Sequence, residues 1–300
     1  LAVHTLIRTA GDANNDVTIT GDLNGNQILT ITAVAGDVDV DGTTGGTTPL
    51  AQFLITDAAN VDLGDVTTQD GTGAGYDINV GSNTAITGTL TLNGDLRTDS
   101  GVDPTGNATD GIRFNSTGTV TLAKAVNPAE TTVLLETDSN DANADGAVTF
   151  VGSFDITSDA AFEEGLSIVV GSNDVDLSGA TITNLDHLLI TTDTANSVTI
   201  PNDVTVGDAG GLGTTDGIDI TTGIINLGGD LDTTADTTNN ASGVNLDGDV
   251  VLTGSNSVSI NTDATGTDGD VVITGTVTAT TAGDEDLTIT SGAGNVDLQG

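Results

Sequence analysis

Residues 268–300, DGDVVITGTVTATTAGDEDLTITSGAGNVDLQG, decide the fold class. The stretch holds four short phrases in which an aliphatic residue recurs at every second position, and each phrase ends at Gly, Asp, Asn or Thr. A period of two places one set of side chains on one face of a β-strand, whereas an amphipathic helix would need a spacing of three and four. We therefore predict four strands. Their aliphatic pairs are Val271 and Ile273, Val277 and Ala279, Leu287 and Ile289, and Val296 and Leu298.

Residues 17–42, VTITGDLNGNQILTITAVAGDVDVDG, resemble the end of the chain, residues 271–300. Val17 aligns with Val271, 254 residues later (271 − 17), and Leu29 aligns with Leu287, 258 residues later (287 − 29). We expect residues 1–300 to form one continuous solenoid, an excerpt of a longer chain with tandem repeats of roughly 258 residues. The alternative is chance similarity within a biased composition.

A shorter period recurs between these two ends. An aliphatic residue is followed closely by Thr-Asp, then by a polar loop and a new alternating segment. Repeats of roughly 20 to 50 residues, each of them one supersecondary unit, are typical of solenoids. The recurring groups are Leu96 with Thr98 and Asp99, Leu135 with Thr137 and Asp138, Ile190 with Thr192 and Asp193, and Ile260 with Thr262 and Asp263.

The alternating segments favour a parallel β-helix over other repeat folds. Helical repeats need sustained spacing of three and four, and helix-forming Lys, Arg, Gln and Met are almost absent. Immunoglobulin-like sandwiches and propellers need aromatic core residues, whereas the chain has five Phe and one Tyr. We predict an all-β chain whose short strands are joined by Gly, Asp, Asn and Thr turns. Successive coils would stack about 4.8 Å apart.

The predicted core consists of the aliphatic and Phe members of the alternating pairs, with Thr and Asp between them facing solvent. These residues should point to a common dry axis, where burial of each side chain contributes about 1.5–3 kcal/mol. The predicted inward residues are Val17, Ile19, Leu29, Ile31, Val38, Val40, Leu90, Leu92, Ile112, Phe114, Val148, Phe150, Phe154, Ile156, Leu166, Ile168, Val175, Leu177, Leu188, Ile190, Val198, Ile200, Ile218, Ile220, Val250, Leu252, Val271, Ile273, Leu287, Ile289, Val296 and Leu298.

In its phrases the chain also resembles the strand-repeat regions of giant bacterial surface and secreted proteins of the filamentous-haemagglutinin type. The resemblance lies in residues 270–300 and in VDVDGTTGGTTPLAQFLIT, residues 38–56, and its style extends over nearly the whole chain. It implies a right-handed parallel β-helix located outside the cell or on the cell surface. It carries over no catalytic residue, and the amino-terminal secretion domain of such adhesins is not visible in this sequence.

Charge excludes several classes of partner. The chain has 44 acidic residues, four basic residues and a formal net charge of −40. Binding to nucleic acid requires Lys and Arg to replace counterions on phosphates, and an anionic membrane surface would repel the chain. We therefore expect no nucleic acid and no membrane insertion. Strong acidity is also found in disordered chains, but the plentiful, regularly spaced Val, Ile and Leu argue for a folded protein.

Two loops carry oxygen ligands at alternate positions, as the first half of a calcium loop does. A calcium loop would also have a bidentate Glu at its twelfth position, which from Asp141 is Gly152. The alternative is an Asx turn at a corner of the solenoid, in which Asp and Asn bond their own backbone. Diffuse screening of the acidic surface by divalent cations is a further possibility, which we favour over any single site. The candidate Ca²⁺ ligands are Asp141, Asn143 and Asp145 in one loop and Asp12, Asn14 and Asp16 in the other.

No group of residues predicts catalysis. Carboxylates occur throughout, the basic residues are scattered, and His187 in LDHLLI fits an outward or hydrogen-bonded strand position better than a general base. We expect a structural extracellular protein, a stalk, fibre or matrix filament that associates with itself end to end or laterally. The alternative is an adhesin stalk whose binding tip lies elsewhere in a longer chain. Surface glycans could attach at the sequons that begin at Asn107, Asn115 and Asn240.

Overall fold

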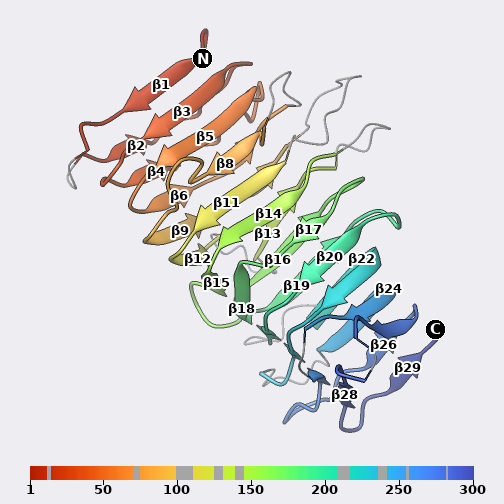
Figure 1. Cartoon of the computed structure of the whole chain (residues 1–300). Helices are drawn as coiled ribbons and strands as arrows, with labels where there is room; N and C mark the ends of the chain where they lie inside the picture. The colour runs from red at the N-terminus through yellow and green to blue at the C-terminus, as the bar shows by residue number, and fades with distance from the viewer. Residues whose placement is uncertain are drawn as a thin grey trace.

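The chain winds round one axis through three faces, always in the same order (Figure 1). The computed structural model describes residues 1–11, 15–69, 75–98, 111–124, 131–138, 145–207, 217–235, 242–254, 257–281 and 283–300. Within these ranges it has 29 strands and no helix, as the period-two alternation predicts. All the strand pairs are parallel, so the predicted β-solenoid is confirmed. One passage through the three faces is called a coil below.

The strands divide among the faces as follows. Face 1 holds β1 (Thr5–Arg8), β3 (Ile28–Thr32), β5 (Gln52–Asp57), β8 (Ile78–Val80), β11 (Ile112–Ser116), β14 (Val148–Gly152), β17 (Val175–Asp176), β20 (Ser197–Ile200), the second parts of β22 (Gly217–Leu227) and β24 (Gly243–Leu252), and β27 (Val277–Ala279). Face 2 holds β2 (Val17–Ile19), β4 (Val38–Val40), β6 (Val61–Leu63), β9 (Thr89–Leu92), β12 (Thr119–Leu122), β15 (Phe154–Ser158), β18 (Ala180–Leu185), β21 (Val204–Val206), β23 (Leu231–Asp232), β25 (Val258–Asn261) and β28 (Leu287–Thr290). Face 3 holds β7 (Val66–Thr67), β10 (Leu96–Arg97), β13 (Thr131–Glu136), β16 (Glu164–Val169), β19 (His187–Thr191), the first parts of β22 and β24, β26 (Val271–Ile273) and β29 (Val296–Leu298).

Faces 1 and 3 are joined in one sheet of 18 strands, and face 2 is a separate sheet of 11 strands. The join arises because β22 and β24 continue round a corner without interruption. The first part of β22 pairs with β19 on face 3, and its second part pairs with β20 on face 1. Strands between the first and last coils therefore have their partners in the preceding and following coils, and hydrogen bonds between coils run along the axis.

Inward side chains stack into aliphatic columns with one member per coil. On face 3 the column is buried from Val66 to Ile273. A smaller residue at its centre would leave a cavity between the two adjoining coils, and a polar residue there would leave a group without a hydrogen-bond partner. Phe114 and Phe150 stack with ring centroids 5.1 Å apart, and Phe150 contacts Phe154 at 5.8 Å. The face 3 column consists of Val66, Leu96, Leu135, Ile168, Ile190, Ile220, Leu246, Ile273 and Leu298.

The predicted core is correct along most of the chain and wrong at its end. Val296 is 46% exposed and Leu298 is 55% exposed, although both continue the inward columns of Val271 and Ile273. The reason is that β29 pairs with β26 on one side only, so that no coil of the described chain covers its other side. Ile19, Leu287 and Ile289 are half-buried against the core.

The threonines of the recurring Thr-Asp groups lie two positions after an inward aliphatic residue, and they are buried. They are Thr98, Thr137, Thr192 and Thr262, and Thr233, two positions after Leu231, is buried in the same way. Thr137, Thr233 and Thr262 each donate a hydroxyl hydrogen bond of 2.6 Å to a backbone carbonyl at the far side of the loop that follows. The acceptors are the carbonyls of Gly146, Ser242 and Gly269. We call each of these three contacts a threonine clasp. Burial of the hydroxyl is tolerated because its hydrogen-bonding capacity is used.

The two similar stretches of sequence lie one face apart. Val17 is on face 2 and Val271 on face 3, and likewise Leu29 is on face 1 and Leu287 on face 2. The chain visits the faces in the order 1, 2, 3, so the later copy is advanced by one face. A strand-and-corner phrase can therefore occupy any of the three faces.

Candidate functional site

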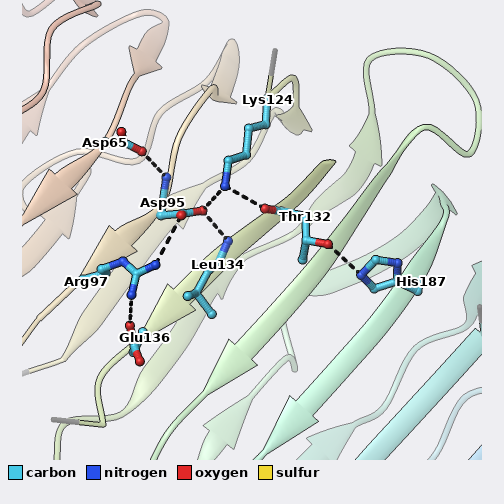
Figure 2. A network of polar contacts seen from close by, with 8 residues as sticks. All are labelled: Asp65, Asp95, Arg97, Lys124, Thr132, Leu134, Glu136 and His187. Atoms are coloured by element: carbon cyan, nitrogen blue, oxygen red, sulfur yellow. Dashed lines mark hydrogen bonds and ion pairs between the residues drawn. The ribbon is translucent and has the colours of Figure 1, made fainter. Parts of the chain in front are cut away.

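Among the residues that the structure describes, the largest group of charged contacts lies on the outer surface near β10 and β13, where two of the four basic residues approach Asp95 (Figure 2). Lys124 Nζ lies 2.5 Å from Asp95 Oδ1, and Arg97 Nη2 lies 3.4 Å from Asp95 Oδ2. Arg97 also forms an ion pair with Glu136 in the next coil. Side chains this exposed to solvent contribute about 1 kcal/mol or less per pair, because water screens the charges.

Asp95 also joins backbone groups of three successive coils. Its own N–H donates to Asp65 Oδ1 at 2.8 Å, and its Oδ1 accepts the N–H of Leu134 at 3.0 Å. Lys124 Nζ in turn donates to the carbonyl of Thr132 at 2.9 Å (Figure 2). The carboxylate is thus a fixed part of the backbone network, which accounts for its position better than binding of an external ligand does.

A second, buried group lies beside it. His187 is 1% exposed, and its Nδ1 lies 2.7 Å from Asp186 Oδ2 while its Nε2 lies 3.1 Å from Thr132 Oγ1. The ring passes over Gly165, where an added β-carbon would come within 2.2 Å of Cε1 and Nε2. His187 in one coil therefore reaches Thr132 two coils away, and our prediction of a hydrogen-bonded strand position is confirmed.

Carboxylate, imidazole and hydroxyl in this order form the arrangement by which hydrolases activate a nucleophile. In this chain the imidazole is enclosed and both of its nitrogens have partners. A substrate could reach Nε2 only by displacing Thr132. The geometry therefore suits a polar tie between coils, and the prediction that the chain is not an enzyme stays a prediction.

Asp159, Glu163 and Glu164 form a carboxylate cluster at the adjoining corner, and one ligand oxygen from each lies within 4.8 Å of the others. Glu164 is 2% exposed and contacts the hydroxyl of Ser158. Burial raises the pKa of Glu164 to about 7, the Ser158 hydrogen bond lowers it, and the charge of Asp159 raises it. Three carboxylates could supply some of the six to eight oxygens that Ca²⁺ prefers. The oxygen-ligand spacing that marks the two candidate calcium loops does not occur here, and the only sequence signal for this group is the closeness of three acidic residues along the chain.

The predicted calcium ligands that the structure describes are Asp145 and Asp16, and both bind backbone of the following coil. Asp145 is 5% exposed; its Oδ2 accepts the N–H of Ser172 at 2.8 Å, and its own N–H donates to Ser172 Oγ at 2.8 Å. Asp16 is exposed, and its Oδ1 accepts the N–H of Asp37 at 2.9 Å. The remaining candidates lie outside the described residues, so neither loop can be assembled into a site from the described geometry. They are Asp12, Asn14, Asp141 and Asn143.

These two contacts belong to a general arrangement, and we call each contact of this kind a staple. In each staple a side-chain oxygen of Asp or Asn accepts a backbone N–H of the following coil, at 2.6 to 3.1 Å and 21 to 39 residues away. At Asp16 and Asp145 the alternative to a calcium site was an Asx turn within one corner, whereas these carboxylates connect neighbouring coils. Asx turns do occur at Asp176 and Asp232, whose Oδ1 atoms accept the N–H of the residue two positions later. The acceptors are Asp16, Asp22, Asn24, Asp37, Asn60, Asp65, Asp95, Asp145, Asp174, Asp203, Asp230, Asp249, Asp268 and Asp270.

Of the three predicted sequons, one has its Asn in the described part of the chain. Asn115 Nδ2 donates to the carbonyl of Gly81 at 3.0 Å, so this amide is engaged in a contact between coils. Asn107 and Asn240 lie outside the described residues.

Comparison with known proteins adds no relative: no family model, no curated protein and no solved structure matches the chain. No described segment forms a helix long and apolar enough to cross a membrane. Function is therefore inferred below from the solenoid itself, from its charge and from the polar contacts just described.

Proposed function

We propose that the chain is a rigid segment of a structural extracellular repeat protein, and that it serves in a stalk, fibre or matrix filament. The observation that supports this proposal is the unbroken parallel register of the face 3 column from Val66 to Leu298. Each coil is held to its neighbours by strand hydrogen bonds, by a shared dry core and by the staples. Bending or extending such a rod requires many of these contacts to break together.

The acidic surface fits a role as a spacer. A net charge of −40 makes parallel rods repel one another, and dissolved divalent cations would reduce that repulsion or bridge neighbouring rods. Calcium is the cation we propose, acting over the whole surface. A cell-surface or extracellular location, where millimolar calcium sites function, belongs to the same proposal.

Self-association end to end is the second part of the proposal. Both ends of the described solenoid leave inward side chains incompletely covered: Ile7 is half-buried at one end, and Val296 and Leu298 are exposed at the other. Parallel strands there also have unpaired backbone groups on one side. A further coil, from a longer chain or from a second copy, would cover both.

Electron microscopy of negatively stained protein, with calcium and with a chelator, tests the proposal. We expect end-to-end rods in both conditions and lateral bundles only with calcium. The variant Leu298→Asp should shorten the rods, whereas Thr221→Asp, on an outward position of β22, should not. Single rods of one length in all conditions would instead support the alternative, an adhesin stalk that presents a tip located elsewhere.

A further inference from the structure

Four adjacent strands of face 2 present a regular array of threonines to solvent. β9, β12, β15 and β18 each place two residues of an alternating segment outward, and seven of these eight residues are Thr. The side chains between them are buried in the core. We call this surface the threonine face. It consists of Thr89 and Thr91, Thr119 and Thr121, Asp155 and Thr157, and Thr181 and Thr183.

The threonine face is a rigid two-dimensional lattice. The four strands are in uninterrupted register, so that Thr91, Thr121, Thr157 and Thr183 form one column and the other four residues form a second. Neighbouring strands lie about 4.7–4.9 Å apart, and residues two apart along a strand are separated by about 6.6 Å. Threonine is branched at its β-carbon and has few χ1 rotamers, so its hydroxyl and methyl groups are held in place.

Hydroxyl groups on this face are available to an external partner. Among the described residues, only Thr157 of the seven threonines donates a side-chain hydrogen bond, to the carbonyl of Ser158 at 3.3 Å. By contrast, the clasp residues Thr137, Thr233 and Thr262 use their hydroxyls within the fold. The solenoid therefore separates two uses of threonine, one internal and one directed outward.

The charge of the face restricts what can occupy it. Only Asp155 has an acidic side chain among its eight residues, on a chain with 44 acidic residues. A cationic partner would find its complement elsewhere on the surface, and an anionic one would be repelled. The face has no aromatic side chain on which a sugar ring could stack. It is also the flat side of a sheet, so an added peptide strand cannot pair with it.

We propose that the threonine face binds the ordered water of an ice surface. Such an occupant is neutral, donates and accepts hydrogen bonds, and repeats in two dimensions, as the face does. One net hydrogen bond contributes only about 1 kcal/mol, so adhesion needs many hydroxyls in register on a rigid support. The methyl groups between the hydroxyls add apolar contacts that order adjacent water. This role goes beyond that of a scaffold and does not depend on it.

Both borders of the face are visible in the structure. Toward the N-terminus the next outward residue in the column is Asp62, which pairs in register with Thr91. Toward the C-terminus the register shifts between Ile182 and Leu185, at Asn184, whose φ of 58° is left-handed. Charge at one border and a bulge at the other confine the array to four coils.

Thermal hysteresis and the inhibition of ice recrystallisation test the proposal on the intact chain. We expect the wild type to shape ice crystals and to be taken up into a growing ice surface. Thr121→Lys places a charged side chain at the centre of the array and should abolish both effects. Thr121→Val, which replaces the hydroxyl by a methyl group and keeps the shape, should cause a partial loss with no change in melting temperature.

Thr221→Lys is the matched control, because Thr221 is an outward, half-buried strand residue of β22 on another face. It should keep full ice activity. The proposal is overturned if the wild type is inactive, or if Thr121→Lys and Thr221→Lys behave alike. It is also overturned if sedimentation shows a wild-type dimer that Thr121→Lys dissociates while neither protein binds ice, since the face would then be an interface between copies.

Discussion

The imidazole ring of His187 fills the space over Gly165 that a β-carbon would need, 2.2 Å from ring atoms Cε1 and Nε2. Glycine in the middle coil is what allows the histidine to reach Thr132 beyond it. His187 and Gly165, in neighbouring coils, are therefore coupled by packing, and Thr132 is coupled to His187 by a hydrogen bond.

Gly165→Ala should lower the free energy of unfolding by about 1–3 kcal/mol, because the added methyl group forces the ring to move. Urea denaturation measures this change. Gly21→Ala is the control, since no atom lies within 4 Å of its added β-carbon, and it should have almost no effect. In a double-mutant cycle with His187→Ala the two losses should not add. Equal effects of the two alanine substitutions would contradict the proposed coupling.

Glu164→Gln should make the protein more stable than the wild type at alkaline pH. The folded-state pKa of Glu164 is raised to about 7 by burial, from an unfolded value of 4.5. Its contribution to stability is therefore complete below about pH 4.5 and is lost as the pH rises through 7. Unfolding in urea at pH 5 and pH 9 should show an advantage for the variant that grows to at most about 3 kcal/mol.

Glu163→Gln is the control for that experiment. The charge of this exposed neighbour makes the smallest contribution to the raised pKa of Glu164, so the variant should gain only a small fraction of that advantage at pH 9. An advantage of Glu164→Gln that is the same at pH 5 and pH 9 would show that deprotonation in the fold is not its cause.

Asp230→Ala should cost about 1 kcal/mol, because its carboxylate accepts the N–H of Ser259 at 2.7 Å and the substitution removes that staple. Asp230→Asn keeps an acceptor oxygen and should cost less. Asp155→Ala removes an exposed carboxylate with no such contact and should be neutral or slightly stabilising, because it makes the net charge less negative. Thermal melts of the three variants measure the order. If Asp155→Ala lowered the melting temperature as much as Asp230→Ala does, loss of the staple would not be the cause of the destabilisation.

Ile220→Asp should lower the free energy of unfolding by more than about 3 kcal/mol, since Ile220 is fully buried in the face 3 column and a carboxylate there has no partner. Thr221→Asp changes the next residue, which faces outward, and should have a small effect. Circular dichroism during heating distinguishes the two. A similar melting temperature for both variants would place Ile220 outside the core.

Thermal melts with calcium, magnesium or sodium at matched ionic strength test how cations act on this surface. We expect diffuse screening, so that both divalent ions raise the melting temperature similarly and without saturation at low concentration. A saturable shift specific to calcium and lost in Asp141→Asn would instead place an ion in the predicted loop at Asp141–Asp145. The same comparison with Asp12→Asn tests the loop at Asp12–Asp16.

Alternation of apolar and polar residues was enough to predict the strands and the inward columns, because the period of a strand is local. Leu90 and Leu92, for example, are both buried as expected. Val296 and Leu298 have the same pattern and are exposed, because burial depends also on the coil that lies next to them. Local sequence carries no information about that neighbour.

Polar contacts between coils could not be predicted, because coils differ in length. The staple from Asp16 to Asp37 spans 21 residues, whereas the one from Asp95 to Leu134 spans 39, so no fixed spacing marks them. The contact of His187 with Thr132 spans 55 residues and depends on a glycine between them. These contacts become visible only when the register of the coils is known.

The threonine clasps separate the length of a loop from the geometry of the coil beneath it. Donor and acceptor are nine residues apart at Thr137 and Thr233 but seven apart at Thr262, and the hydrogen bond measures 2.6 Å in all three. Segments enclosed by a clasp can therefore be lengthened or exchanged with little penalty to the rod. Such positions are natural points for grafting a foreign peptide, and for evolution to test new surface features on an unchanged frame.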